Sequence, residues 1–438
     1  MNEYLERFKT GDITVGIIGL GYVGLPLMLT FGRKGVRCLG FDVDMQKVDR
    51  LSRGESYIAH IPSEPIAALS KDGLISATVD FTRASEPDAL LMCVPTPLNV
   101  HREPDMRYVE ATARSVGPHL RAGQLVVLES TTYPGTTDEL LKGILEDESG
   151  LKAGEDFFLA YSPEREDPGN ANFDTQRIPK VVGGLTDTCR DAAVALYDRA
   201  LDEVVPVDSA RVAEMTKLFE NIFRSVNIAL VNELKVLCDR MHIDVWDVIR
   251  AASTKPFGFM PFYPGPGLGG HCIPIDPFYL TWKAREYELN TRFIELAGEI
   301  NTAMPRYVVQ RTADALNENG KPLKDAKVMV LGLAYKRDVD DSRESPAFKV
   351  IELLQERGAD VSYHDPHVPA APVKRDYSLE MNSTELTADS LAAVDVVLIV
   401  TDHRAVDYEL VAAHAPLIVD TRNAMATVSA GREKVFKA

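Results

Sequence analysis

The chain of 438 residues is long enough for two or three domains with buried cores. Its 48 Lys and Arg residues are outnumbered by 65 Asp and Glu residues, and the formal net charge of −17 argues against nucleic acid or an anionic membrane as the main partner. The five scattered cysteines lack metal-ligand spacing and favour a reducing compartment over a disulfide framework.

No signal peptide precedes the first predicted strand, and no apolar run approaches the roughly 18 residues that span a bilayer. We therefore expect a cytoplasmic protein without a membrane partner. An anionic substrate must find a local basic pocket, because the overall charge of the chain repels it.

The first predicted elements form a strand–turn–helix–strand unit. Residues 15–19 are a short apolar run typical of a buried parallel strand, residues 25–34 have a helical pattern, and residues 36–41 form a second strand. The turn reads Gly19-Leu20-Gly21-Tyr22-Val23-Gly24, and Asp42 follows the second strand. This combination is the fingerprint of dinucleotide binding. Asp42 would accept hydrogen bonds from ribose hydroxyls and repel a 2′-phosphate, so the sequence predicts NAD rather than NADP.

The residues of the turn have separate predicted roles. Gly19 permits the tight turn, Gly21 lets the backbone approach the pyrophosphate, and Gly24 lets the helix pack on the strand. The amides at the start of the helix, at Tyr22 and Val23, face the phosphates.

Further buried strands are predicted at residues 89–94, 125–129 and 157–161. In an open parallel sheet, ligands bind at the carboxyl ends of the strands, so the loops that follow are candidates for cofactor or substrate binding. The candidate residues are Pro95 and Thr96 after the first of these strands, Thr131 after the second, and Glu164 and Arg165 after the third.

From about Arg211 the pattern changes to a helical period. Apolar residues recur at three- and four-residue spacing as far as Leu237, and no proline interrupts residues 208–255. A helix of this length is a common connector between domains and a common dimer surface, although an apolar stripe is also typical of core. We expect a homodimer or a higher homo-oligomer.

A glycine-rich loop after this helix carries one thiol, Cys272. The loop reads Gly265-Pro266-Gly267-Leu268-Gly269-Gly270-His271-Cys272, and Asp276 lies four residues beyond the thiol. Glycines let a ligand approach closely, and a thiolate is a strong nucleophile. The alternative is a buried cysteine that acts as a small hydrophobe. Phe262 and Tyr263 precede the loop and either stack on a ligand or pack at a domain junction.

A third region, from about Lys324, has the pattern of a second α/β sheet without an intact glycine motif. Its predicted strands are residues 327–333, 361–363 and 396–400. Lys336, Arg337 and Arg343 follow the first of these strands and would hold a pyrophosphate or the edge of the cofactor, unless they only pair with neighbouring aspartates. The predicted fold class is α/β, with two doubly wound Rossmann-like domains joined by a central helical domain with one long helix.

With these motifs in this order, the chain resembles the UDP-sugar 6-dehydrogenase family, within the UDP-glucose and GDP-mannose dehydrogenase superfamily. The resemblance covers nearly the whole chain, from about Ile13 to the C-terminal sheet. The form Gly-His-Cys-Ile-Pro-Ile-Asp-Pro around the thiol, together with Ser-Pro-Glu-Arg at residues 162–165, resembles the branch that acts on UDP-N-acetylhexosamines. The implied domains are 1–205 for NAD, 206–305 with the thiol loop and the dimer interface, and 306–438 for the UDP-sugar.

The resemblance implies an NAD-dependent, four-electron oxidation of the C6 alcohol of the sugar to a carboxylate. The alcohol becomes an aldehyde, Cys272 attacks it to give a thiohemiacetal, and a second oxidation gives a thioester that water releases as the acid. The best candidate substrate is UDP-N-acetylglucosamine, and the product would feed bacterial surface polysaccharide such as lipopolysaccharide O-antigen. The same chemistry on UDP-N-acetylmannosamine, UDP-N-acetylgalactosamine or UDP-glucose remains open.

The resemblance also implies catalytic roles for individual residues. Lys217 and Asn221, one helical turn apart, would stabilise an oxyanion. Glu164 would order or activate water, with Thr131 as a hydroxyl partner, and Asp276 would tune the site. The alternatives are a solvated lysine at Lys217 and a turn-capping role for Asp276.

Binding residues are implied in the same way. The implied cofactor contacts are Gly19, Gly21, Tyr22, Val23, Gly24, Asp42, Pro95, Thr96, Thr131 and Arg343. The implied substrate contacts are Glu164, Arg165, Lys217, Asn221, Lys255, Phe262, Tyr263, Gly269, Lys336 and Arg337. The chain departs from the UDP-glucose branch at Ile275, where a lysine is usual, and Lys255 only lies nearest to the place of an absent arginine.

Two other functions are considered. A two-electron hydroxyacid dehydrogenase would have a Rossmann domain, a helical domain and a catalytic lysine, but it would need neither Cys272 nor the third region. A sensor that binds NAD or a nucleotide sugar without turnover would not need Cys272, Lys217, Asn221 and Asp276 together.

Overall fold

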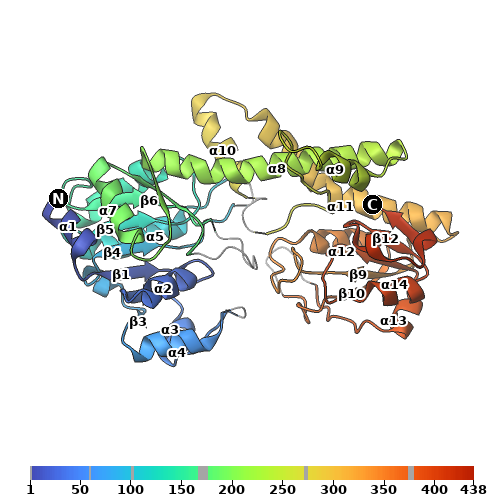
Figure 1. Ribbon diagram of the computed structural model, residues 1–438, viewed down its shortest axis with the longest axis horizontal. Helices are drawn as coiled ribbons and strands as arrows, with labels where there is room; N and C mark the ends of the chain where they lie inside the picture. Colours follow the sequence, from blue (N-terminus) through green and yellow to red (C-terminus); the bar gives the residue numbers. More distant parts are fainter. Residues whose placement is uncertain (1, 59–60, 100–102, 166–175, 271–274, 373–378) are drawn as a thin grey trace. The chain divides into compact units, whose positions relative to one another are not determined.

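The computed structural model describes residues 2–58, 61–99, 103–165, 176–270, 275–372 and 379–438 (Figure 1). The chain divides into two compact units. The first consists of Met1–Glu220 and Trp282–Leu289, and the second of Asn221–Thr281 and Asn290–Ala438. The long helix α8 (Ala210–Arg240) begins in the first unit and ends in the second. Each unit is built on its own sheet, which confirms the predicted fold class.

Within its described residues, the first unit contains an eight-stranded sheet with the order β3-β2-β1-β4-β5-β6-β7-β8. The strands are β1 (Thr14–Ile18), β2 (Arg37–Phe41), β3 (Ile75–Thr78), β4 (Ala89–Met92), β5 (Leu125–Leu128), β6 (Phe158–Tyr161), β7 (Lys180–Gly184) and β8 (Val204–Val207). Neighbouring strands are parallel, apart from the antiparallel pair β6–β7. The strand order reverses between β1 and β4, which is where sheets of this kind bind ligands.

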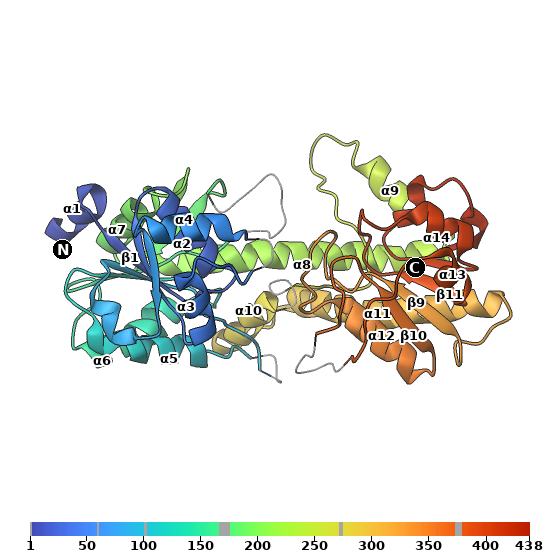
Figure 2. The same cartoon turned by 90° about the horizontal axis from the view of Figure 1, so that it is seen from below.

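Helices cover both faces of this sheet (Figure 2). They are α1 (Asn2–Thr10), α2 (Gly24–Arg33), α3 (Met45–Ser52), α4 (Ser63–Lys71), α5 (Arg107–Val116), α6 (Lys142–Ser149) and α7 (Asp187–Tyr197). Strands β4, β5 and β6 are buried throughout, as their continuous apolar runs predict for a sheet covered on both faces. Aromatic side chains of α1, α2 and α7 pack over one face, where Phe8 meets Phe158 edge-on and Phe31 lies against Tyr197.

The second unit has, in its described part, a five-stranded parallel sheet with the order β10-β9-β11-β12-β13. Its strands are β9 (Lys327–Leu331), β10 (Asp360–His364), β11 (Val396–Ile399), β12 (Ile418–Asp420) and β13 (Val435–Lys437). The other helices are α9 (Val245–Ala252), α10 (Asp276–Ala284), which ends in the first unit, α11 (Arg292–Glu318), α12 (Pro346–Glu356), α13 (Ala388–Ala392) and α14 (Tyr408–His414). The order reverses between β9 and β11, so this sheet also has a switch point.

Helix α8 agrees with the helical period predicted from about Arg211 to Leu237, and the region also contains helices that were not predicted. Helix α8 ends at Arg240, where His242 adopts a left-handed backbone with φ +55°, and Asp244 then caps α9 by accepting a hydrogen bond from the Trp246 amide. The 27-residue helix α11 was not predicted, although it contains Pro305 and buries one face. Within the described part of the chain, no helix combines the length and the apolar character that a membrane span requires.

Candidate active site

Two positions of the turn between β1 and α2 accept only glycine. Gly19 has φ +91°, and a β-carbon there would lie 2.6 Å from the carbonyl oxygen of Cys93. A β-carbon at Gly24 would lie 1.9 Å from the carbonyl oxygen of Gly19. Around Gly21 a β-carbon would meet no described atom within 4 Å, so the backbone borders open space. No described side chain caps the N-terminus of α2, and such a terminus attracts phosphate.

Asp42 lies at the carboxyl end of β2 and is buried. Its Oδ2 accepts hydrogen bonds from the Leu20 amide (2.9 Å) and the Lys47 ammonium (3.0 Å), and its Oδ1 accepts from the Asp44 amide (2.9 Å). These donors fix the carboxylate beside the glycine turn and leave about one of its four acceptor sites for a ribose hydroxyl. The open turn, the uncapped helix and this carboxylate fit NAD.

Asp42→Asn is expected to lower the ratio of kcat/KM with NAD to kcat/KM with NADP by about 10-fold or more. The variant loses charge-assisted hydrogen bonds to the ribose, worth about 1.5–3 kcal/mol, and no longer repels a 2′-phosphate. Initial rates with both dinucleotides measure the ratio. Asp44→Asn is the matched control, because Asp44 is an exposed carboxylate two residues away that caps α3. An unchanged ratio in Asp42→Asn would exclude this role.

The loops after β4 and β5 lie against each other. The Thr96 hydroxyl donates to the Thr131 carbonyl oxygen (2.7 Å), and the Ser130 hydroxyl donates to the Val94 carbonyl oxygen (2.6 Å). Pro95 is exposed, while Thr96 and Thr131 are half-buried. The structure thus brings together the two predicted loops at the switch-point edge of the sheet.

Glu214 holds the second of these loops and was missed by the sequence analysis. Its carboxylate, completely buried on α8, accepts hydrogen bonds from the amides of Gly135 and Thr137 (2.8 and 2.9 Å) and from the Thr137 hydroxyl (2.7 Å). Burial raises the pKa of Glu214 to about 7, although the hydrogen bonds from Thr137 and Gly135 lower it. The sequence signal was an acid between the apolar positions Ala213 and Leu218 of the helix.

This carboxyl makes stability depend on pH. Its folded pKa of about 7 exceeds the ordinary value of 4.5, so its contribution is fully present below pH 4.5 and is lost as pH rises through 7. Relative to Glu214→Gln, the wild type should lose about 2–3 kcal/mol of unfolding free energy between pH 5 and pH 8. Urea denaturation of both proteins across this range measures the difference. Glu233→Gln, at an exposed position of the same helix, should show no such trend.

Glu164 and Arg165 follow β6 and are both half-buried. The Glu164 carboxylate accepts from the Arg165 amide (2.7 Å) and lies 3.4 Å from the ammonium of Lys180. The Arg165 guanidinium pairs with Glu220 (2.6 Å) and donates to the Pro179 carbonyl oxygen. Sequence analysis did not single out Lys180, because the contact joins residues 16 positions apart across an antiparallel strand pair.

Lys217, Asn221 and Asp276 are all buried, with 7%, 5% and 3% exposure. The Asn221 side-chain amide donates to Asp276 Oδ2 (2.5 Å), which fixes both groups. No described residue forms an ion pair or hydrogen bond with the Lys217 ammonium. A buried cation without a counter-charge is unfavourable unless a ligand supplies one. This argues against a solvated lysine at position 217.

The thiol Cys272 lies outside the described residues, but the glycine loop before it is described. Gly267 and Gly270 have φ +138° and +84°, and a β-carbon at Gly269 would lie 2.7 Å from the Tyr335 β-carbon. The amide of Gly270 donates to the Arg343 carbonyl oxygen (3.3 Å). The loop therefore packs on the segment after β9, which carries the predicted basic residues.

In that segment, two of the predicted basic residues pair with aspartates. Arg337 pairs with Asp402, and Arg343 pairs with Asp341 (2.6 Å). Lys336 also has a partner. These pairs match the salt-bridged alternative at least in part, so the basic residues are not a free cluster of charge in this structure.

A further cation, Arg422, lies just after β12 and was missed. Its Nε donates to the Val400 carbonyl oxygen (3.1 Å), and no described carboxylate pairs with its guanidinium. Burial lowers the pKa of Arg422 to about 10, with a further lowering by the nearby Arg337 and an opposing effect of Asp420. A β-carbon at Gly265 would lie 2.6 Å from this guanidinium, so the glycine makes room for it.

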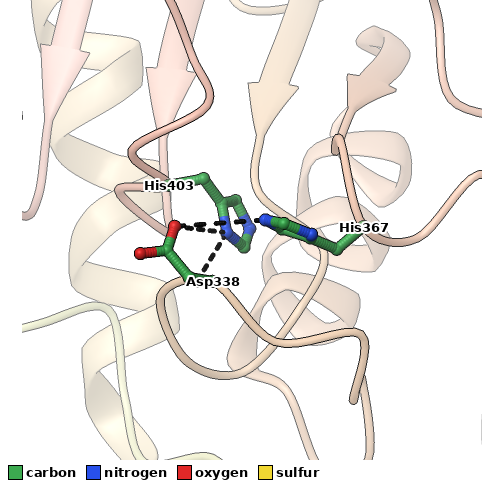
Figure 3. Close-up of side chains that lie close together, drawn as sticks. All are labelled: Asp338, His367 and His403. Atoms are coloured by element: carbon green, nitrogen blue, oxygen red, sulfur yellow. Dashed lines mark hydrogen bonds and ion pairs between the residues drawn. The ribbon is translucent and has the colours of Figure 1, made fainter. Parts of the chain in front are cut away.

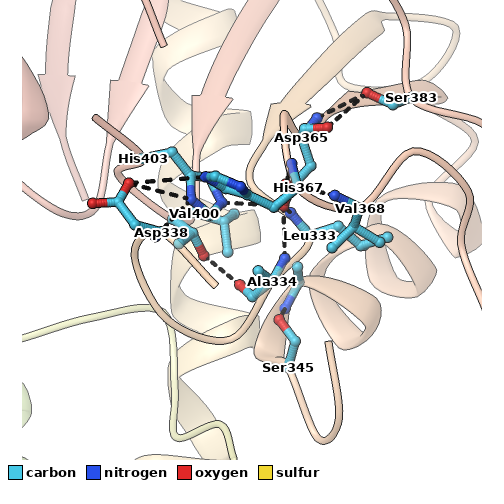
Figure 4. A network of polar contacts seen from close by, with 12 residues as sticks. Leu333, Ala334, Asp338, Ser345, Asp365, His367, Val368, Ser383, Val400 and His403 are labelled. Carbon is cyan, nitrogen blue, oxygen red and sulfur yellow. Dashed lines mark hydrogen bonds and ion pairs between the residues drawn. The ribbon is translucent and has the colours of Figure 1, made fainter. Parts of the chain in front are cut away.

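Asp338, His367 and His403 lie side by side (Figure 3), with one potential ligand atom of each within 4.8 Å of the others. His403 has no free ring nitrogen, because Nδ1 accepts from the Asp338 amide (2.9 Å) and Nε2 donates to Asp365 Oδ2 (3.1 Å). The group is therefore a hydrogen-bond network rather than a metal site. Asp365 also accepts from the Leu333 amide (Figure 4), so the network fixes the segment after β9.

The remaining predicted substrate residues make mainly aromatic contacts. Phe262 meets Phe223 edge-on at 5.6 Å, and Tyr263 stacks on Trp246 at 5.8 Å. Lys255 is exposed and lies over the Phe257 ring. None of these contacts tests a substrate role.

Comparisons with known proteins agree with this architecture. Residues 13–201 match the NAD binding domain of the UDP-glucose/GDP-mannose dehydrogenase family, residues 211–303 its central domain, and residues 329–427 its UDP binding domain.

Individual relatives cover the chain almost completely. UDP-N-acetyl-D-mannosamine dehydrogenase of Salmonella typhi is 36% identical over 424 residues, which are 93% of this chain and 98% of that protein. NDP-N-acetyl-D-galactosaminuronic acid dehydrogenase of Ralstonia solanacearum is 34% identical over 421 residues, 93% of this chain and 95% of that protein. The solved structure of a UDP-D-ManNAc dehydrogenase from Pyrococcus horikoshii matches with a TM-score of 0.88 at 29% identity, covering 97% of this chain and 99% of that one. The chain therefore belongs to the UDP-glucose/GDP-mannose dehydrogenase family and is an NAD-dependent oxidoreductase that acts on the CH–OH group of a UDP-sugar.

Proposed function

We propose that the protein oxidises the C6 alcohol of a UDP-N-acetylhexosamine to the corresponding uronate in a four-electron reaction. The observation that carries this proposal is the buried Lys217 ammonium without a described partner, on the same helix as Asn221, which is held by Asp276. A fixed cation and a fixed amide are what a developing oxyanion needs. The relatives named for N-acetylmannosamine and N-acetylgalactosaminuronic acid support the N-acetylhexosamine class.

The reaction balances with two covalent intermediates on Cys272, a thiohemiacetal and a thioester. Bound NAD would supply the hydride acceptor for both oxidations, so one alcohol, one water and two NAD would give one carboxylic acid, two NADH and two protons. Between the two oxidations, the sulfur of Cys272 adds to the aldehyde carbon. The resulting thiohemiacetal retains the C–H hydrogen that the second oxidation removes. Water then breaks the C–S bond of the thioester and restores the thiol. Glu164 takes the proton of that water, with Thr131 as its hydroxyl partner.

The UDP group is assigned to the second unit. Arg422, which has no described carboxylate partner, would bind a phosphate, with Arg337 as a second cation. Lys336, Phe262, Tyr263 and the loop at Gly269 remain proposed substrate contacts, and Lys255 and Arg343 remain weaker candidates.

We also propose that the protein is at least a homodimer. Large apolar side chains on α8 are exposed at steps of three or four residues, with one step of seven between Phe223 and Leu230. They are Val212, Met215, Phe219, Phe223, Leu230, Leu234 and Leu237. Such a stripe is typical of a helix that packs against another helix. Light scattering should give at least twice the 48.3 kDa mass of one chain, and Leu230→Glu with Leu234→Glu should lower it to one chain. A wild-type mass of one chain at every concentration would refute the dimer.

The test of the function is the amount of NADH formed per molecule of limiting sugar with excess NAD. UDP-N-acetylmannosamine is the first substrate to test, because of the relatives, and UDP-N-acetylglucosamine, the substrate predicted from the sequence, is the second. Two NADH per sugar would support the four-electron oxidation, whereas one would mean that the reaction stops at the aldehyde. If the protein oxidises only UDP-glucose or only UDP-N-acetylgalactosamine, that sugar nucleotide is its substrate.

A further inference from the structure

The first unit contains a buried lysine–glutamate pair, Lys180 and Glu129, to which the proposed reaction gives no role. Lys180, the first residue of β7, has its Nζ 2.5 Å from Oε2 of Glu129 and 3.4 Å from Oε2 of Glu164. Lys180 and Glu129 are 5% and 1% exposed, and the other oxygen of Glu129 accepts a hydrogen bond from the Tyr197 hydroxyl. One ammonium therefore joins a buried inner carboxylate, held at both oxygens, to the outer carboxylate of Glu164.

The contacts determine the charges of this group. Burial raises the pKa of Glu129, whereas Lys180 and the hydrogen bond from Tyr197 lower it, and an ammonium 2.5 Å from one oxygen with a hydroxyl donating to the other favours the carboxylate form. Burial lowers the pKa of Lys180, but Glu129 and Glu164 together outweigh it and raise that pKa above its ordinary value. Burial and the charge of Glu129 raise the pKa of both Cys93 and Tyr197, which stay neutral. The titratable groups that face Lys180 are thus two carboxylates, one thiol and one phenol.

A contribution to folding stability does not explain why these charges are buried. Burying an ion pair costs desolvation that the attraction between the charges only roughly offsets, and apolar replacements are often neutral or stabilising. The consequence specific to this group is geometric. Lys180 stands in a strand paired on both sides, with β6 and β8, and Glu129 fixes its ammonium, so Glu164 is drawn to a fixed point. Arg165 next to it is held by Glu220.

We propose that Lys180 is a positioning residue for Glu164: anchored by Glu129, its ammonium keeps the Glu164 carboxylate ionised and oriented toward the water that releases the product. This inference rests on the role proposed above for Glu164. In that step water adds to the thioester carbonyl, Glu164 takes one proton from the water, and the C–S bond breaks with the electron pair going to sulfur. The same proton then restores the thiol.

The experiment compares variants that remove the cation without leaving an unpaired buried charge. Lys180→Met combined with Glu129→Gln removes both buried charges at similar volume, and the glutamine still accepts from Tyr197. Lys152→Met combined with Glu146→Gln is the matched control, because it removes a lysine–glutamate pair at 3.3 Å in the same unit, with Lys152 exposed. Lys180→Arg tests whether another cation restores the function, and Glu164→Gln tests the premise.

The double variant at positions 129 and 180 should lower kcat about 10-fold or more, with KM for NAD unchanged. The acid limb of its kcat–pH profile should move to higher pH by about one unit, because the cation no longer favours the ionised carboxylate. Rapid mixing should show a burst of NADH, and mass spectrometry should show accumulated acyl-enzyme. Adding Glu164→Gln to the double variant should lower kcat by a smaller factor than the same substitution does in the wild type, and Lys180→Arg should stay near wild type.

Three results would overturn the proposal, and each can be distinguished from the other two. If Glu164→Gln slows product release but the double variant keeps the wild-type kcat and pH profile, Glu164 acts without Lys180. If Glu164→Gln itself keeps the wild-type kcat, the assigned role of Glu164 fails and the positioning role falls with it. A lower kcat with an unshifted pH profile and no acyl-enzyme would mean that the charge group is only structural.

Discussion

Cys272→Ala is expected to abolish formation of the uronate, with a fall in rate of about 10⁴-fold or more, while NAD binding and folding are retained. Without the thiol, no thiohemiacetal forms, so the second oxidation lacks its covalent intermediate. The size of the effect is that of removing a nucleophile, for which knockouts in other enzymes cost up to about 10⁶-fold. The measurements are uronate formed from the UDP-sugar and NADH formed per sugar, which should fall below two.

The control for this variant is Cys238→Ala. Cys238 is a buried cysteine of α8 that packs with Val245 and Ile249, so its removal reports a loss of packing alone. This control should keep two NADH per sugar. Uronate formation at the wild-type rate in Cys272→Ala would disprove the covalent mechanism and return the hydroxyacid dehydrogenase and sensor hypotheses to consideration.

Lys217→Met is expected to lower kcat about 10²- to 10³-fold and, at the same time, to raise stability. The loss of rate follows from removing a fixed positive charge at the oxyanion. The gain in stability, about 1 kcal/mol, follows because the buried ammonium has no described counter-charge and a methionine fills the same space without desolvation. Steady-state kinetics and thermal unfolding of the same preparation measure the two effects.

The matched control is Lys235→Met on the same helix. Lys235 is also buried, but its ammonium pairs with Asp239, so this variant should lose stability and leave kcat unchanged. A loss of stability in Lys217→Met would show that its ammonium has a structural partner, and an unchanged kcat would remove it from the active site.

Long-range contacts separate what the sequence predicted from what it missed. The structure adds three interactions that no local pattern contained: Glu214 with the amides of residues 135 and 137, Lys180 with Glu129, and His403 with Asp365. Each joins residues that are 38 to 79 positions apart. Their sequence environments are ordinary, so only the fold reveals the partners.

Local patterns by themselves determined the class of this protein. The apolar runs predicted the strands, and the glycine turn with Asp42 predicted NAD, because both depend on backbone conformation and on residues close together in the chain. The ordered motifs led to the family, which the comparisons confirmed. The division at residues 205 and 305, the substrate epimer and the individual site roles remain predictions.

The tertiary structure alone decided which polar groups are buried and what they contact. Nothing in the sequence around Lys217 distinguishes it from other lysines. It became a candidate active-site residue because its ammonium is buried without a described counter-charge. Arg422 became a candidate because its half-buried guanidinium has no described carboxylate partner, whereas the predicted Arg337 proved to be paired with Asp402. Desolvation and charge pairing act through space, and residues far apart in the chain share a buried environment only after it folds.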